Sequence, residues 1–257
     1  MAPDGSNLVQ LTRNQGDNTD PSWSPDSDKI AFVSNRPTND TSGGQFIYIM
    51  NADGSDVHQV TYEENCKTPD WSNDYQWIAY SSDGDIYVTY WDGNKDPIKL
   101  TDSPEEDHNP VISPDSSKIA WLSGKDDSWN IFVMNLDGSD KRQITDNGKA
   151  YDVSWTINGQ LFSHWDQPDG ICLSCVMDWD GANLKDAGGK GELQQYLPFW
   201  TLEGNRVECV SVDLNGQPEE IFLVSPIFEG LFLNLTNNPS VDRNPDWPSH
   251  CADYRDD

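Results

Sequence analysis

The chain has 257 residues and a formal net charge of −28 at pH 7. A surface of that sign repels phosphate backbones and anionic lipids, which argues against nucleic acid or a membrane surface as the partner. No apolar run is long enough to cross a bilayer, so we expect no membrane insertion. Much of the aspartate falls in Asp-Gly and Pro-Asp turns, where this residue suits the turn chemistry.

One short phrase, Pro-Ser-Trp-Ser-Pro-Asp in its fullest form, recurs along the chain. Its central position returns at intervals of about 45 residues, at Trp23, Trp71, Ile112, Trp155, Trp200 and Trp247. A repeat of that length with several short strands is typical of a β-propeller, which builds one four-stranded blade per repeat. We expect the tryptophans on the inner strands of a single ring, packed between adjacent blades.

The first complete unit sets the strand pattern. Residues 29–34 alternate in polarity, as a half-buried strand requires, and Asp53-Gly54 suits a tight hairpin. In chain order we predict strands at residues 22–24, 29–34, 46–50, 57–61, 77–80, 86–88, 98–101, 119–122, 131–134, 143–145, 161–163, 175–177, 207–210 and 221–224. Residues 186–196 are expected to form a loop with at most a weak strand. No helix of normal length is expected, so the fold class is all-β.

The unit QLT…PSWSPDSDKIAFVSNR…IYIMNADGSD resembles the TolB-like β-propeller repeat, a relative of the WD repeat. The resemblance covers residues 1–248, taken as a single domain, and leaves 249–257 as a C-terminal tail. It implies six four-stranded antiparallel blades in an exported protein that binds protein or glycan more often than it catalyses. We therefore expect a periplasmic or extracellular binding and scaffolding domain that is not an enzyme and needs no cofactor.

The strand count gives five full blades and an incomplete or split sixth. Residues 7–12 match a fourth strand without the first three, and residues 244–247 match a first strand with nothing after it. Either the chain is truncated, or the sixth blade is a stub, or another molecule completes it, because open sheet edges recruit strands. An assembly subunit, a homo-oligomer built through this blade, is thus an alternative function. Its pairing strands would include Leu8, Val9, Gln10, Leu11 and Trp247, at an intermolecular contact or against residues 249–255.

Acidic side chains recur where the chain enters the first strand of a unit. They are Asp17, Asp20, Asp107, Asp152 and Asp242, with His108 beside them. In a propeller these entries surround one mouth of the central channel, so the set could form a funnel for a cation or a basic peptide. Alternatively, each carboxylate holds its loop by accepting backbone hydrogen bonds. The second interpretation is favoured, because loops of the family carry an acid here whatever the ligand.

The histidines and cysteines predict neither a metal site nor a catalytic residue. His58, His108, His164 and His250 fall at different places in their units. Cys172 and Cys175 have the spacing of a zinc half-site, but on a strand such positions face opposite ways. Cys175 and Cys209 are better interpreted as small core residues. A metal-dependent lyase, or the propeller part of a larger peptidase, remains as an alternative function.

Two Asn-x-Thr triplets, at Asn39 and Asn234, are possible glycosylation sites in an exported protein.

Overall fold

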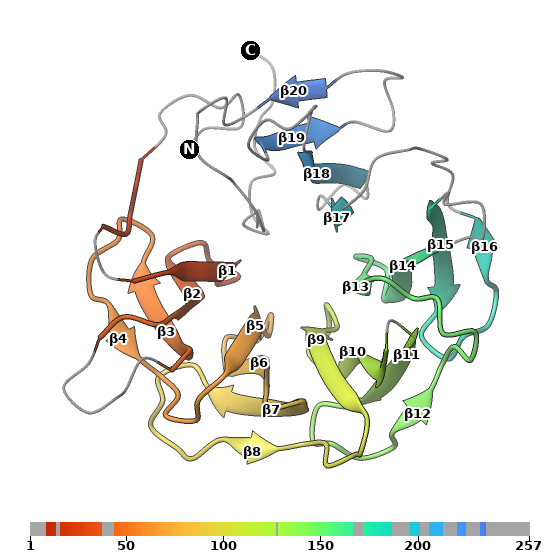
Figure 1. Cartoon of the computed structure of the whole chain (residues 1–257), viewed down its shortest axis with the longest axis horizontal. Coiled ribbons are helices and arrows are strands. Elements are labelled where there is room, and N and C mark those ends of the chain that lie inside the picture. Colours follow the sequence, from red (N-terminus) through yellow and green to blue (C-terminus); the bar gives the residue numbers. More distant parts are fainter. Residues whose placement is uncertain are drawn as a thin grey trace.

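The structure is a computed structural model that describes residues 9–13, 16–37, 44–126, 128–166, 172–186, 196–200, 206–212, 220–224 and 232–234. All regular structure in these ranges is β: five four-stranded antiparallel sheets stand around a common centre (Figure 1). The sheets are the five full blades that the repeat predicts, which confirms the all-β propeller. No helix long and apolar enough to span a bilayer occurs in the described ranges.

Each blade takes its four strands in chain order. Blade 1 contains β1 (Asn18–Trp23), β2 (Lys29–Ser34), β3 (Phe46–Asn51) and β4 (His58–Gln59). Blade 2 contains β5 (Cys66–Trp71), β6 (Trp77–Ser82), β7 (Asp85–Tyr90) and β8 (Ile98–Lys99). Blade 3 contains β9 (Glu106–Ile112), β10 (Lys118–Lys125), β11 (Ser128–Asn135) and β12 (Arg142–Gln143). Blade 4 contains β13 (Ser154–Trp155), β14 (Gln160–Asp166), β15 (Cys172–Asp178) and β16 (Lys185–Asp186). Blade 5 contains β17 (Tyr196–Trp200), β18 (Arg206–Val212), β19 (Glu220–Val224) and β20 (Phe232–Asn234).

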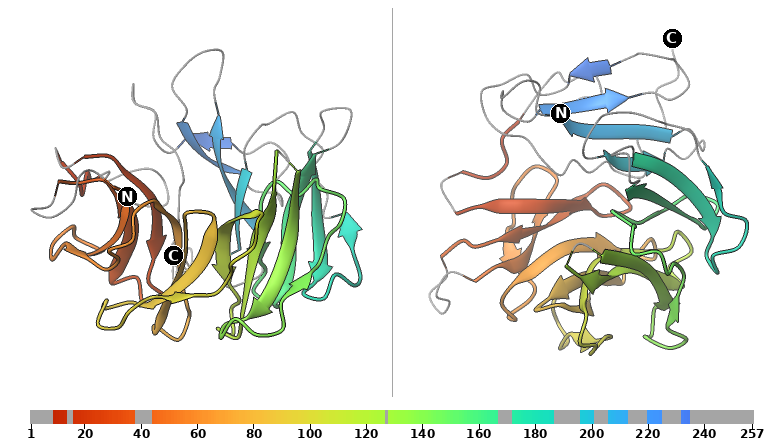
Figure 2. Two further views of the ribbon diagram at one scale, coloured as in Figure 1. Left: turned by 60° about the horizontal axis from the view of Figure 1, so that its bottom comes forward. Right: turned by 45° about the vertical axis from the view of Figure 1, so that its right-hand side comes forward.

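The first strand of every blade lies toward the centre and the fourth lies outermost (Figure 1). Because neighbouring strands are antiparallel, the turns after first and third strands lie at one rim of the ring. The loops after second strands and the links between blades lie at the other rim. We call these the turn rim and the link rim. Figure 2 shows the sheets from two further directions, with their strands running between these rims.

The recurring Ser-x-Asp triplet closes the turn between the first two strands. In blade 1 the Ser24 hydroxyl donates to Asp26 at 2.6 Å and accepts from the amide of Lys29, the first residue of β2, at 2.9 Å. Blades 2 and 3 repeat both bonds with Ser72, Asp74 and Trp77, and with Ser113, Asp115 and Lys118. The phrase therefore recurs because it supplies hydrogen bonds to the same tight turn.

A second recurring contact joins one blade to the next. In blades 2, 3 and 4 the glycine after the third strand has a positive φ and lies against the residue that follows the fourth strand of the preceding blade. The pairs within the described blades are Gly93 with Val60, Gly138 with Leu100 and Gly181 with Ile144. A Cβ at Gly93 would come within 3.1 Å of the Val60 carbonyl oxygen. Glycine is needed here both for its φ and for the close approach of two chains.

The apolar core lies between blades. One cluster joins blades 1 and 2 around Trp71, which is 6% exposed and has its ring centroid 6.2 Å from that of Trp91. Similar clusters join blades 2 and 3 and blades 3 and 4, the latter including Trp155 at its edge. Trp23 packs at the edge of a cluster within blade 1. The predicted place on an inner strand is confirmed for Trp23, Trp71 and Trp155, and the predicted packing between adjacent blades is confirmed for Trp71 and Trp155 but not for Trp23. Trp200 lies in β17, and Trp247 is outside the described residues.

The first strands are longer than predicted. β1 begins at Asn18 and β9 at Glu106, so Asp20, Asp107 and His108 are strand residues rather than loop residues. The cause is a bulge before a proline, where the pairing with the second strand shifts and the strand then continues. The fourth strands of blades 1 to 3 are shorter than predicted. In blade 4 the fourth strand begins at Lys185, one residue before the segment expected to contain at most a weak strand. In blade 1, the Thr61 hydroxyl accepts the bond from the Ile47 amide at 2.9 Å that a longer strand would supply.

The prediction of a strand at Leu8–Thr12 is wrong for the part that the structure describes. Residues 9–13 have no strand pairing, and Val9 is 64% exposed. Leu11 nevertheless packs against Gly54 of blade 1, as Val60 does against Gly93. The segment thus has the inter-blade contact of a fourth strand without a third strand beside it in the described residues.

Candidate functional site

Three neighbouring inner strands carry the same strained bulge. Asp20 in β1, Thr68 in β5 and Asn109 in β9 have φ values of 49°, 48° and 53°, and each precedes a proline. A positive φ is costly for a residue with a Cβ, most of all for a β-branched one such as Thr68. A residue before proline also prefers an extended backbone. Such strain persists only where its surroundings impose it, and it is found often at binding sites.

The bulged strands β1, β5 and β9 lie side by side around the centre (Figure 1). The amide of Thr68 donates a long bond of 3.5 Å to the Asp20 carboxylate of the preceding blade. The amide of Ile112 donates to Asp70 at 2.6 Å, again across a blade boundary. These bonds fix the relative positions of the three strands. The first bond joins β1 and β5 at their bulges, and the second joins β5 and β9 nearer the turn rim.

His108 is the titratable residue that stands out on this surface. It is half-buried, and its ring meets Trp129 edge to face with centroids 4.2 Å apart. Burial lowers the pKa of His108 and Lys67 lowers it further, against opposing effects of Asn109 and the neighbouring acids. The imidazole is therefore neutral at pH 7 and can both donate and accept a hydrogen bond. We name Asp20, Lys67, Thr68, His108 and Asn109 the mouth set.

Asp107 does not line the mouth, because it is only 2% exposed. Its amide donates to the Gly84 carbonyl of the preceding blade at 2.8 Å, and its carboxylate accepts from Ser103 at 3.3 Å. The amides of Cys66 and Ala150 make the equivalent bond to the blade before theirs, and both residues are buried as well. Asp107 therefore stands in a core position of the repeat.

Asp152 forms a buried pair with His164. One carboxylate oxygen of Asp152 accepts a hydrogen bond of 2.7 Å from the His164 amide. The other carboxylate oxygen lies 2.7 Å from the Nδ1 atom of the His164 ring. The two residues are 7% and 2% exposed. The pair ties the entry of blade 4 to β14. Sequence reasoning missed it, because no motif connects a residue on a link with one on the following strand.

The remaining predicted site residues either form contacts within the fold or lie outside the described residues. Asp17 exchanges hydrogen bonds with Asn35 through both its amide and its carboxylate, so it holds the link to blade 1. Asp242, Trp247, Leu8 and the glycosylation candidate Asn39 lie outside the described residues, and so does the side chain of Asn234. Among the acids predicted at the mouth, Asp20 is partly exposed on the wall.

The described residues contain no group of three or more His, Cys, Asp or Glu side chains that could hold a metal ion. His58 lies in outermost β4 and the ring of His164 lies against Asp152, so neither belongs to the mouth set. Cys66 and Cys175 are both buried, as expected for small core residues. In Cys66, burial raises the pKa to about 11, which leaves the unreactive thiol form at neutral pH.

Comparison with known proteins places this arrangement in a family. Residues 1–159 match the TolB beta propeller domain. The chain belongs to this family. It is 31% identical over 136 residues to a Protein TolB homolog of Chlorobium luteolum, a match that covers 52% of this chain and 30% of that protein. The chain thus spans about a third of the length of this curated relative.

Solved structures of low sequence identity share the fold. The crystal structure of TolB from Acinetobacter baumannii superposes with a TM-score of 0.70 at 16% identity, over 90% of this chain and 57% of that one. An oligogalacturonate lyase from Vibrio parahaemolyticus superposes with a TM-score of 0.60 at 12% identity, over 84% of this chain and 65% of that one. At such identities the likeness shows the propeller alone and does not transfer an activity.

Proposed function

We propose that this domain is a non-catalytic binding and scaffolding propeller of an exported protein, with a polypeptide partner that docks at the link-rim mouth. The observation that carries the proposal is the strained bulge repeated in β1, β5 and β9. The bulge gives the inner strands of three adjacent blades the same positive φ where these strands face the channel. Loops and strand ends at one end of a rigid scaffold are where propellers carry their ligands.

The mouth set suits recognition better than catalysis. It combines an exposed ammonium at Lys67, a carboxylate at Asp20 and a neutral imidazole at His108. A polypeptide backbone presents both donors and acceptors, and these groups can satisfy both. The overall charge of −28 favours the approach of a basic partner from a distance. A glycan would use the same hydrogen-bonding groups and is the other ligand class that this surface could serve.

Site-specific photocrosslinking tests the location of the mouth. A photoreactive amino acid in place of Lys67 should give a covalent adduct with another polypeptide in the host that makes this protein. The matched control is the exposed Lys125, which ends β10 at the same rim but one strand farther out. An adduct at 67 and none at 125 is the expected result. Equal yields at both positions, or an adduct at 125 alone, would show that the partner docks elsewhere.

A second candidate function is assembly through strand exchange, which the segment 9–13 favours. Leu11 docks on blade 1 as a fourth-strand residue would, while Val9 stays 64% exposed and the segment pairs with no described strand. A strand from another molecule could pair with this segment, because an edge strand recruits partners. Light scattering after deletion of residues 1–12 tests this role: a change from oligomer to monomer supports it, and a chain that is monomeric before and after deletion refutes it.

A further inference from the structure

The turn rim carries a recurring contact between a lysine and an indole of the next blade. Lys29 begins β2 and places its ammonium 5.6 Å from the ring centre of Trp91 in blade 2. Lys118 begins β10 and lies 4.4 Å from the ring centre of Trp179 in blade 4. Each contact is a cation–π interaction across a blade boundary.

The junction between blades 2 and 3 lacks both partners. Trp77 stands in the position of the two lysines, since its amide donates to Ser72 as theirs do to Ser24 and Ser113. Leu136 stands in the position of the indole: its amide donates to the Ser117 carbonyl, as the Trp91 amide does to Gln76. Leucine is smaller than tryptophan, and the Trp77 ring also contacts the Tyr90 ring of its own blade, with centroids 4.2 Å apart and the planes tilted by 37°.

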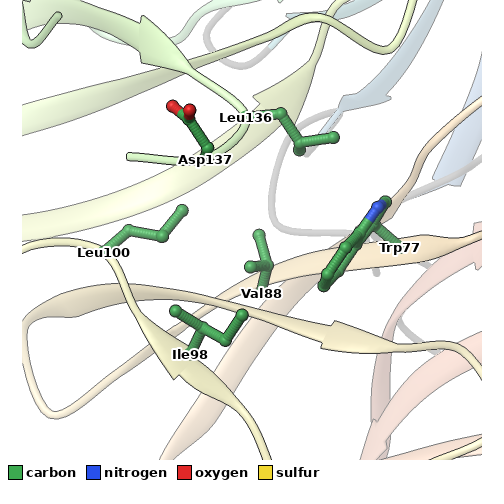
Figure 3. A pocket seen from close by; sticks show the side chains of 6 residues that line it. All are labelled: Trp77, Val88, Ile98, Leu100, Leu136 and Asp137. Carbon is green, nitrogen blue, oxygen red and sulfur yellow. The ribbon is translucent and has the colours of Figure 1, made fainter. Parts of the chain in front are cut away.

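A hollow of about 280 Å³ results at this junction. Figure 3 shows the side chains that line it: Trp77, Val88, Ile98, Leu100, Leu136 and Asp137. Val88 lies off one face of the Trp77 indole, and Leu136 and Asp137 stand across the hollow from Ile98. Ile98 is 48% exposed, so the hollow is accessible from the surface. The walls are one indole and four aliphatic side chains, with a single charged group.

That charged group is a carboxylate at neutral pH. Asp137 accepts bonds from the hydroxyl and the amide of Ser139 at 2.6 and 2.9 Å. These bonds lower the pKa of Asp137, because they favour its ionised form. No ammonium belongs to the lining. Lys99 lines a neighbouring hollow with Lys141, but Lys99 is ion-paired with Asp85 at 2.9 Å and with Asp102 at 2.7 Å.

We propose that this hollow binds a lysine side chain of a partner polypeptide. The stem would pack on the Trp77 indole and Val88, and the ammonium would lie on the Asp137 side of the hollow. Two observations select lysine. At two other junctions a lysine of this chain lies against an indole of the next blade, and the lining of the hollow includes an indole and a carboxylate on a protein of charge −28. The hollow lies on the opposite rim from the mouth set, so it is a separate site and does not depend on the function proposed there.

Short peptides on the whole chain test the site. The probes are acetyl-Gly-Lys-Gly-amide, the same peptide with norleucine, and the same peptide with glutamate. Binding is followed by NMR through the indole N–H of Trp77, assigned with Trp77→Phe. The lysine peptide should shift this signal saturably, the norleucine peptide should bind about tenfold more weakly, and the glutamate peptide should not bind.

Two variants separate the parts of the site. Leu136→Trp restores the indole found at the other junctions and should abolish binding of the lysine peptide while leaving the melting temperature unchanged or higher. Asp137→Asn keeps an acceptor for Ser139 but removes the charge, so it should weaken the lysine peptide about three- to tenfold and leave the norleucine peptide unchanged.

Three results would overturn the proposal. Equal binding of the norleucine and lysine peptides would show a plain apolar pocket. Binding of the glutamate peptide, or of glucuronate as an acidic sugar, would assign the region to Lys99 and Lys141. No saturable shift with any probe would show that the hollow is only a packing defect between blades 2 and 3.

Discussion

The two rims of the ring differ in how closely the blades repeat one another. At the turn rim the same hydrogen bonds recur from blade to blade, as in the serine–aspartate turns of blades 1 to 3 and the glycines against the preceding blade. At the link rim the equivalent inner position is Cys66 in blade 2, Asp107 in blade 3 and Ala150 in blade 4. The turn positions are therefore uniform, whereas this buried position at the link rim holds a different residue type in each blade.

A substitution in the core between the rims should lower the free energy of unfolding most. Trp71→Ala removes a side chain that is 6% exposed and packs between blades 1 and 2. We expect the free energy of unfolding to fall by about 3–5 kcal/mol, measured by chemical denaturation. Tyr62→Ala is the control, because Tyr62 is 74% exposed and its loss should change little. An unchanged melting temperature for Trp71→Ala would contradict the inter-blade packing.

Buried hydrogen-bonded pairs near the link rim should also contribute to stability, and Asp152 with His164 is the clearest of them. Asp152→Ala leaves the buried amide and ring of His164 without their acceptor. We expect a loss of about 2–3 kcal/mol, because unsatisfied buried polar groups keep their desolvation cost. The same substitution at exposed Asp17 should cost less than half as much. If the two variants are equally stable, the Asp152–His164 pair does not hold blade 4.

Two glycines separate backbone conformation from close packing at the turn rim. Gly93 and Gly159 both have a positive φ, at 63° and 74°, but only Gly93 faces another chain segment. Gly159→Ala should cost about 1 kcal/mol for the φ alone, and Gly93→Ala about 1 kcal/mol more for the clash with Val60. Equal losses in thermal unfolding would mean that the blade-to-blade contact is loose.

The serine–aspartate turn should make a small, pH-dependent contribution in blade 3. Bonds from Ser113 and Ser117 lower the pKa of Asp115. A lowered folded-state pKa stabilises the protein above the unfolded pKa of about 3.9, and this part is lost as the pH falls through the folded value. Ser113→Ala should therefore cost about 1 kcal/mol at pH 7 and less in acid. Thr156→Ala is the control: Thr156 accepts from the Gln160 amide at 3.1 Å, and the residue two positions on is Asn158, so its effect should not vary over this range.

The turn rim could be predicted from the sequence because its interactions are local. Serine, aspartate and glycine at fixed short spacings specify a turn without reference to the rest of the chain, so blade number and second and third strands follow from the repeat. The mouth depends on contacts between repeats. The bulge at Thr68 and the burial of Asp107 arise from neighbouring strands, and the hollow at Trp77 arises from a missing partner on blade 3. Such features leave no signal within a single repeat.

The most direct test of the account is the stability of Thr68→Asn. In this account the positive φ of Thr68 is kept for binding, and the bond of its amide to Asp20 in the preceding blade does not require a threonine side chain. Asparagine tolerates a φ of 48° better than threonine, and Asn109 already occupies the equivalent place in β9. The variant should unfold at the same or a higher denaturant concentration, with a gain of up to about 1 kcal/mol. A loss of more than about 1 kcal/mol would show that Thr68 holds the ring together, and would contradict the claim.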